Sequence, residues 1–190
     1  MNSHIPTTKL LTYTNALFKD HRVAAFAPSS TRLIARLGRQ LRAVEPRLII
    51  ELGPGDGVST YEALKVLSPN GQLLAVERNH DFAAALATWT DRRLVVTEGD
   101  ARRADELYAD QLGRADAVIA SIPFTYLTPE DREAIARAAA KLLRPGGRFI
   151  IFHQYSPLMR PVIKKVFGQV HTEFELFNFF PAFLMVGTKK

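Results

Sequence analysis

The chain has no cysteine among its 190 residues, and no hydrophobic run approaches the roughly 20 residues of a membrane-spanning helix. The first absence excludes a disulfide scaffold, a thiolate metal site and a cysteine nucleophile. The N-terminus also lacks the apolar core of a signal peptide, so we expect a cytoplasmic protein that meets a membrane only from its surface. The five histidines are scattered without ligand spacing, and no metal site is predicted.

Acidic residues are scarce at both ends of the chain. Residues 1–50 carry eight Lys and Arg against two Asp and Glu, and residues 141–190 have the same balance. Residues 51–140 hold nine basic and fifteen acidic side chains, within a formal net charge of +6. Basic segments at both ends favour binding to an anionic partner, either nucleic acid or an anionic membrane surface. The alternative is that these charges only keep the surface of the protein solvated.

From residue 47 onward, short apolar segments alternate with helical ones. The expected strands are rich in Val, Ile, Leu and Phe, and they cover 48–52, 73–77, 94–98, 117–121, 148–152, 172–177 and 183–188. The expected helices between them cover 58–67, 79–90, 102–111 and 129–143. This alternation predicts an α/β fold, a Rossmann-like doubly wound, seven-stranded, mostly parallel sheet. The last two strands have no helix between them and predict a C-terminal antiparallel hairpin. The pattern resembles that of class I methyltransferases.

Residues 1–46 differ in character and are predicted to form an N-terminal amphipathic helical extension to a methyltransferase domain at 47–190. Residues 31–43 read as an amphipathic helix, with apolar and basic residues on opposite faces: Leu33, Ile34, Leu37 and Leu41 against Arg32, Arg36 and Arg39. This helix either covers the sheet or lies on a membrane. We expect the membrane contact on 5–22 instead, where basic residues flank apolar ones.

The strongest motif is Glu-Leu-Gly-Pro-Gly-Asp-Gly at 51–57, between an expected strand and an expected helix. Gly53 and Gly55 let the backbone turn tightly and approach a ligand closely. Glycine-rich turns also bind dinucleotides, but Glu51 would repel a pyrophosphate and suits an ammonium group. S-adenosylmethionine carries such an ammonium and no phosphate, so we expect it as the cofactor.

Acids follow the next two strands as well. Glu77 ends the second strand, where a carboxylate can accept hydrogen bonds from both ribose hydroxyls. Asp100 and Ala101 follow the third strand, where the acid can receive an adenine amino group or cap the next helix. Together these strand ends predict one nucleoside pocket at the carboxyl edge of the sheet.

The methyl acceptor is expected beside the fourth and fifth strands. Ser121 ends the fourth strand and can present a hydroxyl near the transferred methyl group. His153 and Tyr155 end the fifth strand, and either can orient an amine acceptor or take its proton. A structural role is the alternative for both.

These segments resemble the bacterial phospholipid N-methyltransferases of the phosphatidylethanolamine-methylating type, from about residue 23 to the C-terminus. The resemblance rests on Ala-Pro-Ser-Ser at 27–30, the motif at 51–57, Glu77, 99–101, 121–123, 152–157 and Asn-Phe-Phe-Pro-Ala at 178–182. It implies N-methylation of phosphatidylethanolamine toward phosphatidylcholine by a monomer, peripherally associated with the cytoplasmic membrane through its basic N-terminal segment. It also implies a cofactor site that includes Arg78 beside Glu77, and Ser29 and Ser30 near the methionine end of the cofactor. Tyr155 would face the lipid head group. Nucleic acid is not expected as a partner.

Two departures from the family's pattern, at Ile122 and at Phe180, where a first proline is usual, keep other readings open. Ile122 alone separates Ser121 from Pro123, so the segment is also similar to the Asn-x-Pro-Phe/Tyr motif of ribosomal RNA adenine N6-dimethyltransferases, with serine in place of asparagine. In that alternative Phe124 stacks on a flipped base. A third reading is a non-catalytic protein that binds S-adenosylmethionine.

Overall fold

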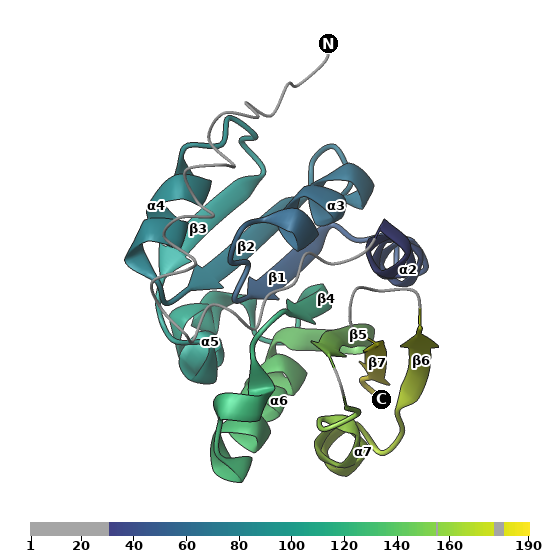
Figure 1. Cartoon of the computed structure of the whole chain (residues 1–190). Helices are drawn as coiled ribbons and strands as arrows, with labels where there is room; N and C mark the ends of the chain where they lie inside the picture. Colours follow the sequence, from purple (N-terminus) through teal and green to yellow (C-terminus); the bar gives the residue numbers. More distant parts are fainter. Residues whose placement is uncertain (1–30, 155, 177–180) are drawn as a thin grey trace.

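A seven-stranded sheet forms the centre of the protein (Figure 1). The computed structural model describes residues 31–154, 156–176 and 181–190. The strand order is β3-β2-β1-β4-β5-β7-β6. The strands are β1 (Leu48–Leu52), β2 (Gln72–Glu77), β3 (Leu94–Glu98), β4 (Ala115–Ala120), β5 (Leu143–Gln154), β6 (His171–Glu175) and β7 (Ala182–Thr188). The first five pair in parallel, and β7 runs antiparallel to both neighbours, which confirms the predicted fold.

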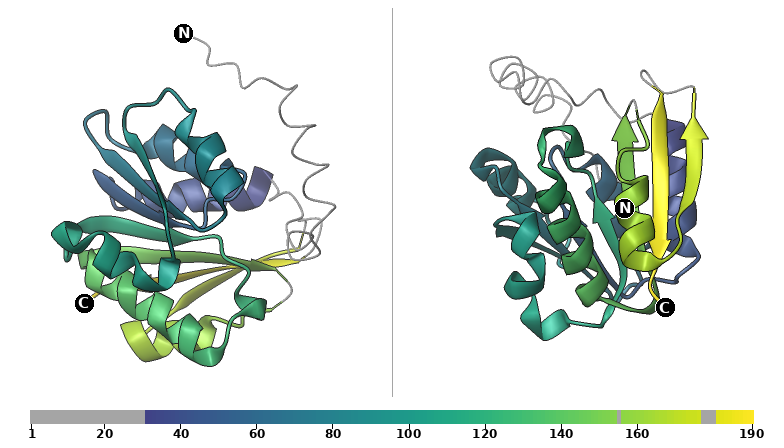
Figure 2. Two further views of the ribbon diagram at one scale, coloured as in Figure 1. Left: turned by 90° about the vertical axis from the view of Figure 1, so that its left-hand side faces the viewer. Right: turned by 90° about the horizontal axis from the view of Figure 1, so that it is seen from below.

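Helices cover both faces of this sheet (Figures 1 and 2). One face carries α2 (Thr31–Arg42), α3 (Val58–Val66) and α4 (His80–Ala87), and the other carries α5 (Ala104–Leu107), α6 (Pro129–Leu142) and α7 (Arg160–Phe167). Side chains alternate along a strand, so each buried strand supplies both cores. In β1, Ile49 packs in the core beneath α2 and α3, whereas Ile50 packs in the core beneath α6.

Helix α2 is a core helix, as one of the two readings of 31–43 predicted. Leu33, Leu37 and Leu41 recur at helical spacing and are almost wholly buried. On its other side, Arg36 Nη1 lies 2.8 Å from Glu173 Oε2 of strand β6. Part of its basic face is therefore paired within the protein. The segment 5–22, where we expect membrane contact, lies outside the described residues.

Local sequence signals explain where α6 begins. Thr128 caps it, because its hydroxyl oxygen accepts a hydrogen bond from the amide of Asp131 at 3.1 Å, and Pro129 occupies the first turn. The single helix expected at 102–111 was wrong. That stretch forms three short helical pieces, η1 (Ala101–Arg103), α5 and η2 (Ala109–Gln111). Helix α7 was missed altogether, although Ile163 and Phe167 bury one side of it.

Candidate active site

The carboxyl ends of β1 to β4 meet at one edge of the sheet, because these strands are parallel and in register. Leu52 pairs with Val76 on one side and with Ala120 on the other, and Glu77 pairs with Glu98. Backbone hydrogen bonds join the turns that follow: the amide of Gly53 donates to Val76 at 2.8 Å, and that of Gly99 to Glu77 at 2.9 Å. The predicted cofactor motifs therefore lie side by side.

The glycine turn after β1 leaves room for a ligand at Gly55. Its φ is +56°, a conformation that residues with a side chain rarely adopt, and a Cβ built there would meet no atom of the described residues within 4 Å. The amide of Gly55 donates a hydrogen bond to Glu77 Oε2 at 3.1 Å. The backbone is thus held in place next to an open space, as close approach of a cofactor requires.

Glu51 lies beneath this turn and is completely buried. Ser59 Oγ donates to its Oε1 at 2.5 Å, and Thr60 Oγ1 donates to its Oε2 at 2.7 Å. Burial raises the pKa of the Glu51 carboxyl to about 7, and the nearby charges of Asp56 and Glu77 act in the same direction, whereas the two hydroxyls lower it. Glu51, the predicted partner of the cofactor's ammonium group, is thus a buried carboxyl group whose hydrogen bonds join β1 to α3.

Glu77 is placed for ribose binding. It is 8% exposed, and its Oε1 accepts the amide of Asn79 at 2.8 Å while Oε2 accepts that of Gly55. Each carboxylate oxygen has a second lone pair, so both can still accept a hydroxyl hydrogen. The neighbouring Arg78 is exposed, and its positive charge lowers the pKa of Asp100, although Arg102 has the larger effect.

Asp100 has the capping role that was the alternative to adenine binding. Its Oδ1 accepts the amide of Arg102 at 2.9 Å, which caps η1, where Ala101 is the first residue. Its carboxylate also pairs with the Arg102 guanidinium, and this hydrogen-bonded pair lowers the pKa of Asp100. Arg102 reaches Asp131 as well, at 3.0 Å, and so joins this turn to α6. Capping uses part of the carboxylate and leaves it partly exposed.

Ser121 follows β4, and its hydroxyl lies 3.3 Å from that of Ser59. Ser59 therefore connects the buried Glu51 to the side of the site where the acceptor is expected. Ser59 and Thr60 were not predicted as site residues. The sequence feature that could have indicated them is a pair of hydroxyl residues in the first turn of a helix that follows an acidic residue and a glycine-rich turn.

Phe124 is 0% exposed and packs in the core beneath α6. Its ring is not available to stack on a base in this conformation. His153 is also buried, at the end of β5, and its Nδ1 lies 2.8 Å from the carbonyl oxygen of Ser156. Since a carbonyl only accepts, Nδ1 carries the hydrogen in this contact. Ser29, Ser30 and Tyr155 lie outside the described residues, so their predicted roles stay predictions.

No helix among residues 31–154, 156–176 and 181–190 is long and apolar enough to cross a membrane. In the same part of the chain, no group of three His, Asp or Glu is placed to hold a metal ion.

Comparison with known proteins assigns the class. Residues 49–147 match the family described as the methyltransferase domain, which is more than half of the chain. The O-methyltransferase from Bacillus cereus, solved in complex with S-adenosylhomocysteine, superposes with a TM-score of 0.71 at 16% identity, covering 100% of this chain and 93% of that one. The chain belongs to the methyltransferase domain family and is a class I methyltransferase whose cofactor is S-adenosylmethionine.

Two curated proteins are similar in sequence. An ornithine lipid N-methyltransferase from Singulisphaera acidiphila is 27% identical over 163 residues, which is 84% of this chain and 85% of that protein. Ribosomal RNA small subunit methyltransferase A from a Burkholderia species is 34% identical over 85 residues, which is 43% of this chain and 30% of that protein. The first likeness spans nearly both chains, and the second spans less than half of either.

Proposed function

We propose that this enzyme transfers methyl groups to the amine nitrogen of a phospholipid head group, converting phosphatidylethanolamine through its methylated intermediates toward phosphatidylcholine. The observation that carries the proposal is the similarity to a lipid N-methyltransferase along 84% of the chain. The segments at 27–30 and 178–182, which resemble those of phospholipid N-methyltransferases, support the same class of acceptor.

The reaction is an in-line displacement, for which positioning supplies most of the rate. S-adenosylmethionine, when bound, supplies a methyl group on a positively charged sulfur. Glu77 binds the ribose hydroxyls, and the amides of the turn at 53–57 approach the rest of the cofactor. The acceptor nitrogen needs a free lone pair, so an ammonium must first lose a proton. Ser121 orients the acceptor with its hydroxyl, and Tyr155 or His153 orients it or receives that proton.

We propose that the protein works in the cytoplasm at the surface of the inner membrane, as a monomer in solution. Its basic N-terminal segment would be drawn to anionic lipid, with each basic residue contributing about 1 kcal/mol near the surface. Binding to anionic vesicles should fall as salt is added. Salt-insensitive binding would contradict the electrostatic part of this proposal.

The decisive experiment incubates the purified protein with methyl-labelled S-adenosylmethionine and one acceptor at a time: phosphatidylethanolamine vesicles, ornithine lipid vesicles or structured ribosomal RNA. We expect label in the phosphatidylethanolamine. Label in ornithine lipid alone would keep the lipid class and change the substrate, and label in RNA alone would overturn the proposal. The RNA reading is supported by the 85-residue match to the RNA enzyme, and the buried Phe124 weighs against it.

Tyr155→Phe tests the acceptor side. Turnover should fall at least about tenfold while the affinity for S-adenosylmethionine stays within about twofold, because the hydroxyl is expected to touch the acceptor and not the cofactor. Tyr61→Phe is the matched control, since Tyr61 is 37% exposed on α3. Equal loss of turnover and cofactor affinity in Tyr155→Phe would make that tyrosine structural.

A further inference from the structure

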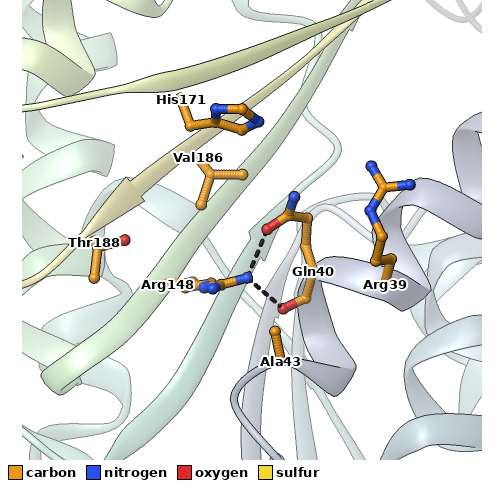
Figure 3. A pocket seen from close by; sticks show the side chains of 7 residues that line it. All are labelled: Arg39, Gln40, Ala43, Arg148, His171, Val186 and Thr188. Atoms are coloured by element: carbon orange, nitrogen blue, oxygen red, sulfur yellow. Dashed lines mark hydrogen bonds between the residues drawn. The ribbon is translucent and has the colours of Figure 1, made fainter.

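A cavity of about 370 Å³ lies between α2 and the C-terminal strands (Figure 3). Its walls include Arg148, His171 and Thr188. Arg148 begins the part of β5 that pairs without a register shift with β4, His171 begins β6, and Thr188 ends β7. Since β7 is antiparallel to β5 and β6, these three positions lie at the amino edge of the sheet. The cofactor motifs lie at the opposite, carboxyl edge. The cavity is therefore separate from the methyl-transfer site.

Arg148 is a half-buried cation without an anionic partner in the described part of the chain. Its Nη1 donates to the main-chain oxygen of Gln40 at 3.1 Å and to Gln40 Oε1 at 2.6 Å, and both acceptors are neutral (Figure 3). No carboxylate among the described residues pairs with it. The strand and the two hydrogen bonds hold the guanidinium in place, and a partly desolvated charge gains from a counter-ion.

Glu173, an acid that contacts the cavity residues Arg39 and Gln40, is already neutralised. Its Oε2 lies 2.8 Å from Arg36 Nη1 and 2.5 Å from Arg39 Nη2, and its Oε1 accepts from Gln40 Nε2 at 2.8 Å. Burial raises the pKa of Glu173, but hydrogen bonds from Arg39, Arg36 and Gln40 outweigh this effect and bring it down to about 2. Arg36 also pairs with Glu175 at 3.0 Å. Two arginines thus offset two acids, and Arg148 is the surplus charge.

We propose that this cavity binds a phosphate-type oxyanion, with the Arg148 guanidinium as its main partner. A guanidinium presents a planar fork of donors that matches a phosphate, and Nη2 and Nε of Arg148 have no partner in the described residues. Arg39 and His171 line the same space, where each also contacts Glu173, at 2.5 Å and 3.4 Å, and the Thr188 hydroxyl adds a neutral donor. Pockets for small ligands begin at about 300 Å³, so there is room for a phosphate with a small organic group. The ligand is either a soluble phosphate compound or the head group of an anionic lipid.

The test measures binding of inorganic phosphate to the full chain at low ionic strength by calorimetry, with wild type, Arg148→Gln and Arg92→Gln. Arg92 is the matched control, since it is exposed and precedes β3, at the far end of the sheet from β6. We expect one saturable site in wild type, an affinity at least about tenfold weaker in Arg148→Gln, and no change in Arg92→Gln. Unchanged binding of S-adenosylmethionine would show that each variant is folded.

If Arg148→Gln does not fold, Thr188→Val is used, because it keeps the contact between Arg148 and Gln40, and it should still weaken phosphate binding. Absence of saturable binding in wild type, or equal losses in Arg148→Gln and Arg92→Gln, would overturn the proposal. Vesicles of phosphatidylglycerol identify the source. Weaker vesicle binding by Arg148→Gln than by Arg92→Gln indicates a lipid head group, and equal vesicle binding with a loss of phosphate binding indicates a soluble ligand.

Discussion

Thr60 Oγ1 donates a 2.7 Å hydrogen bond to Glu51 Oε2, which joins the first turns of α3 to the end of β1. Both residues are 0% exposed. The glycine turn of the cofactor site lies between them in the chain, so this contact closes the base of the turn. Ser59 donates to the other oxygen of the same carboxylate. The position of the turn thus depends on a buried acid that has two hydroxyl partners.

Thr60→Val should destabilise the protein. Valine has nearly the same shape, but it leaves one oxygen of a buried carboxylate without its donor, at a cost of about 1–3 kcal/mol in the free energy of unfolding. Thr88→Val is the control, since Thr88 is exposed and its hydroxyl donates only to the carbonyl of Ala85. Urea unfolding of both variants measures the difference. Similar losses in the free energy of unfolding would contradict a particular contribution of the Thr60–Glu51 hydrogen bond to stability.

The stability of the protein should fall as pH rises from about 4.5 to about 7, through the contribution of Glu51. Its pKa is about 7 in the fold, against an ordinary value of 4.5, so the folded state binds more protons than the unfolded state within this window. The contribution declines by up to about 1.4 kcal/mol per pH unit and is constant above pH 7. Glu51→Gln should remove this decline, as chemical unfolding at several pH values would show. A parallel pH profile for wild type and variant would place the folded pKa near its ordinary value.

Glu77→Gln should weaken binding of S-adenosylmethionine by at least about tenfold, because a charged acceptor for the ribose hydroxyls is replaced by a neutral amide. Glu98→Gln is the control: Glu98 is the register partner of Glu77 on β3, but its side chain is 55% exposed and pairs with His80. Calorimetry with the cofactor gives both affinities. Equal affinities would show that the ribose is bound by other residues.

Gly57→Ala should cost more stability than Gly113→Ala. Both glycines have positive φ, +83° and +72°, so alanine is strained by about 1–2 kcal/mol at either position. At Gly57, however, a Cβ would lie 2.8 Å from Leu86 and from Trp89, whereas at Gly113 it would meet nothing within 4 Å. The added overpacking is about 1–3 kcal/mol. Trp89 is the single tryptophan of the chain, so its fluorescence should change in Gly57→Ala only.

Several elements follow from local sequence because their signals are local. Strand β1 has the predicted bounds, since a nearly continuous apolar run, interrupted only by Glu51, specifies a strand buried on both faces. The start of α6 follows from Thr128 and Pro129, which act within one turn. The stretch 102–111 breaks into short pieces, with Asp100 capping η1. Helix α7 is only eight residues long, and its apolar side is hard to distinguish from a strand by periodicity.

The sequence by itself determined the class of protein: strand and helix alternation, a glycine turn after an acid, and acids at successive strand ends are encoded within short segments. The tertiary structure decided which side chains meet. Ser59 and Ser121 are 62 residues apart in the chain, and Arg36 and Glu173 are 137 apart. Such contacts depend on strand order and on how α2 packs, which no local pattern specifies. For the same reason only the fold shows that Arg148 has no counter-ion among the described residues, whereas Arg36 and Arg39 are paired.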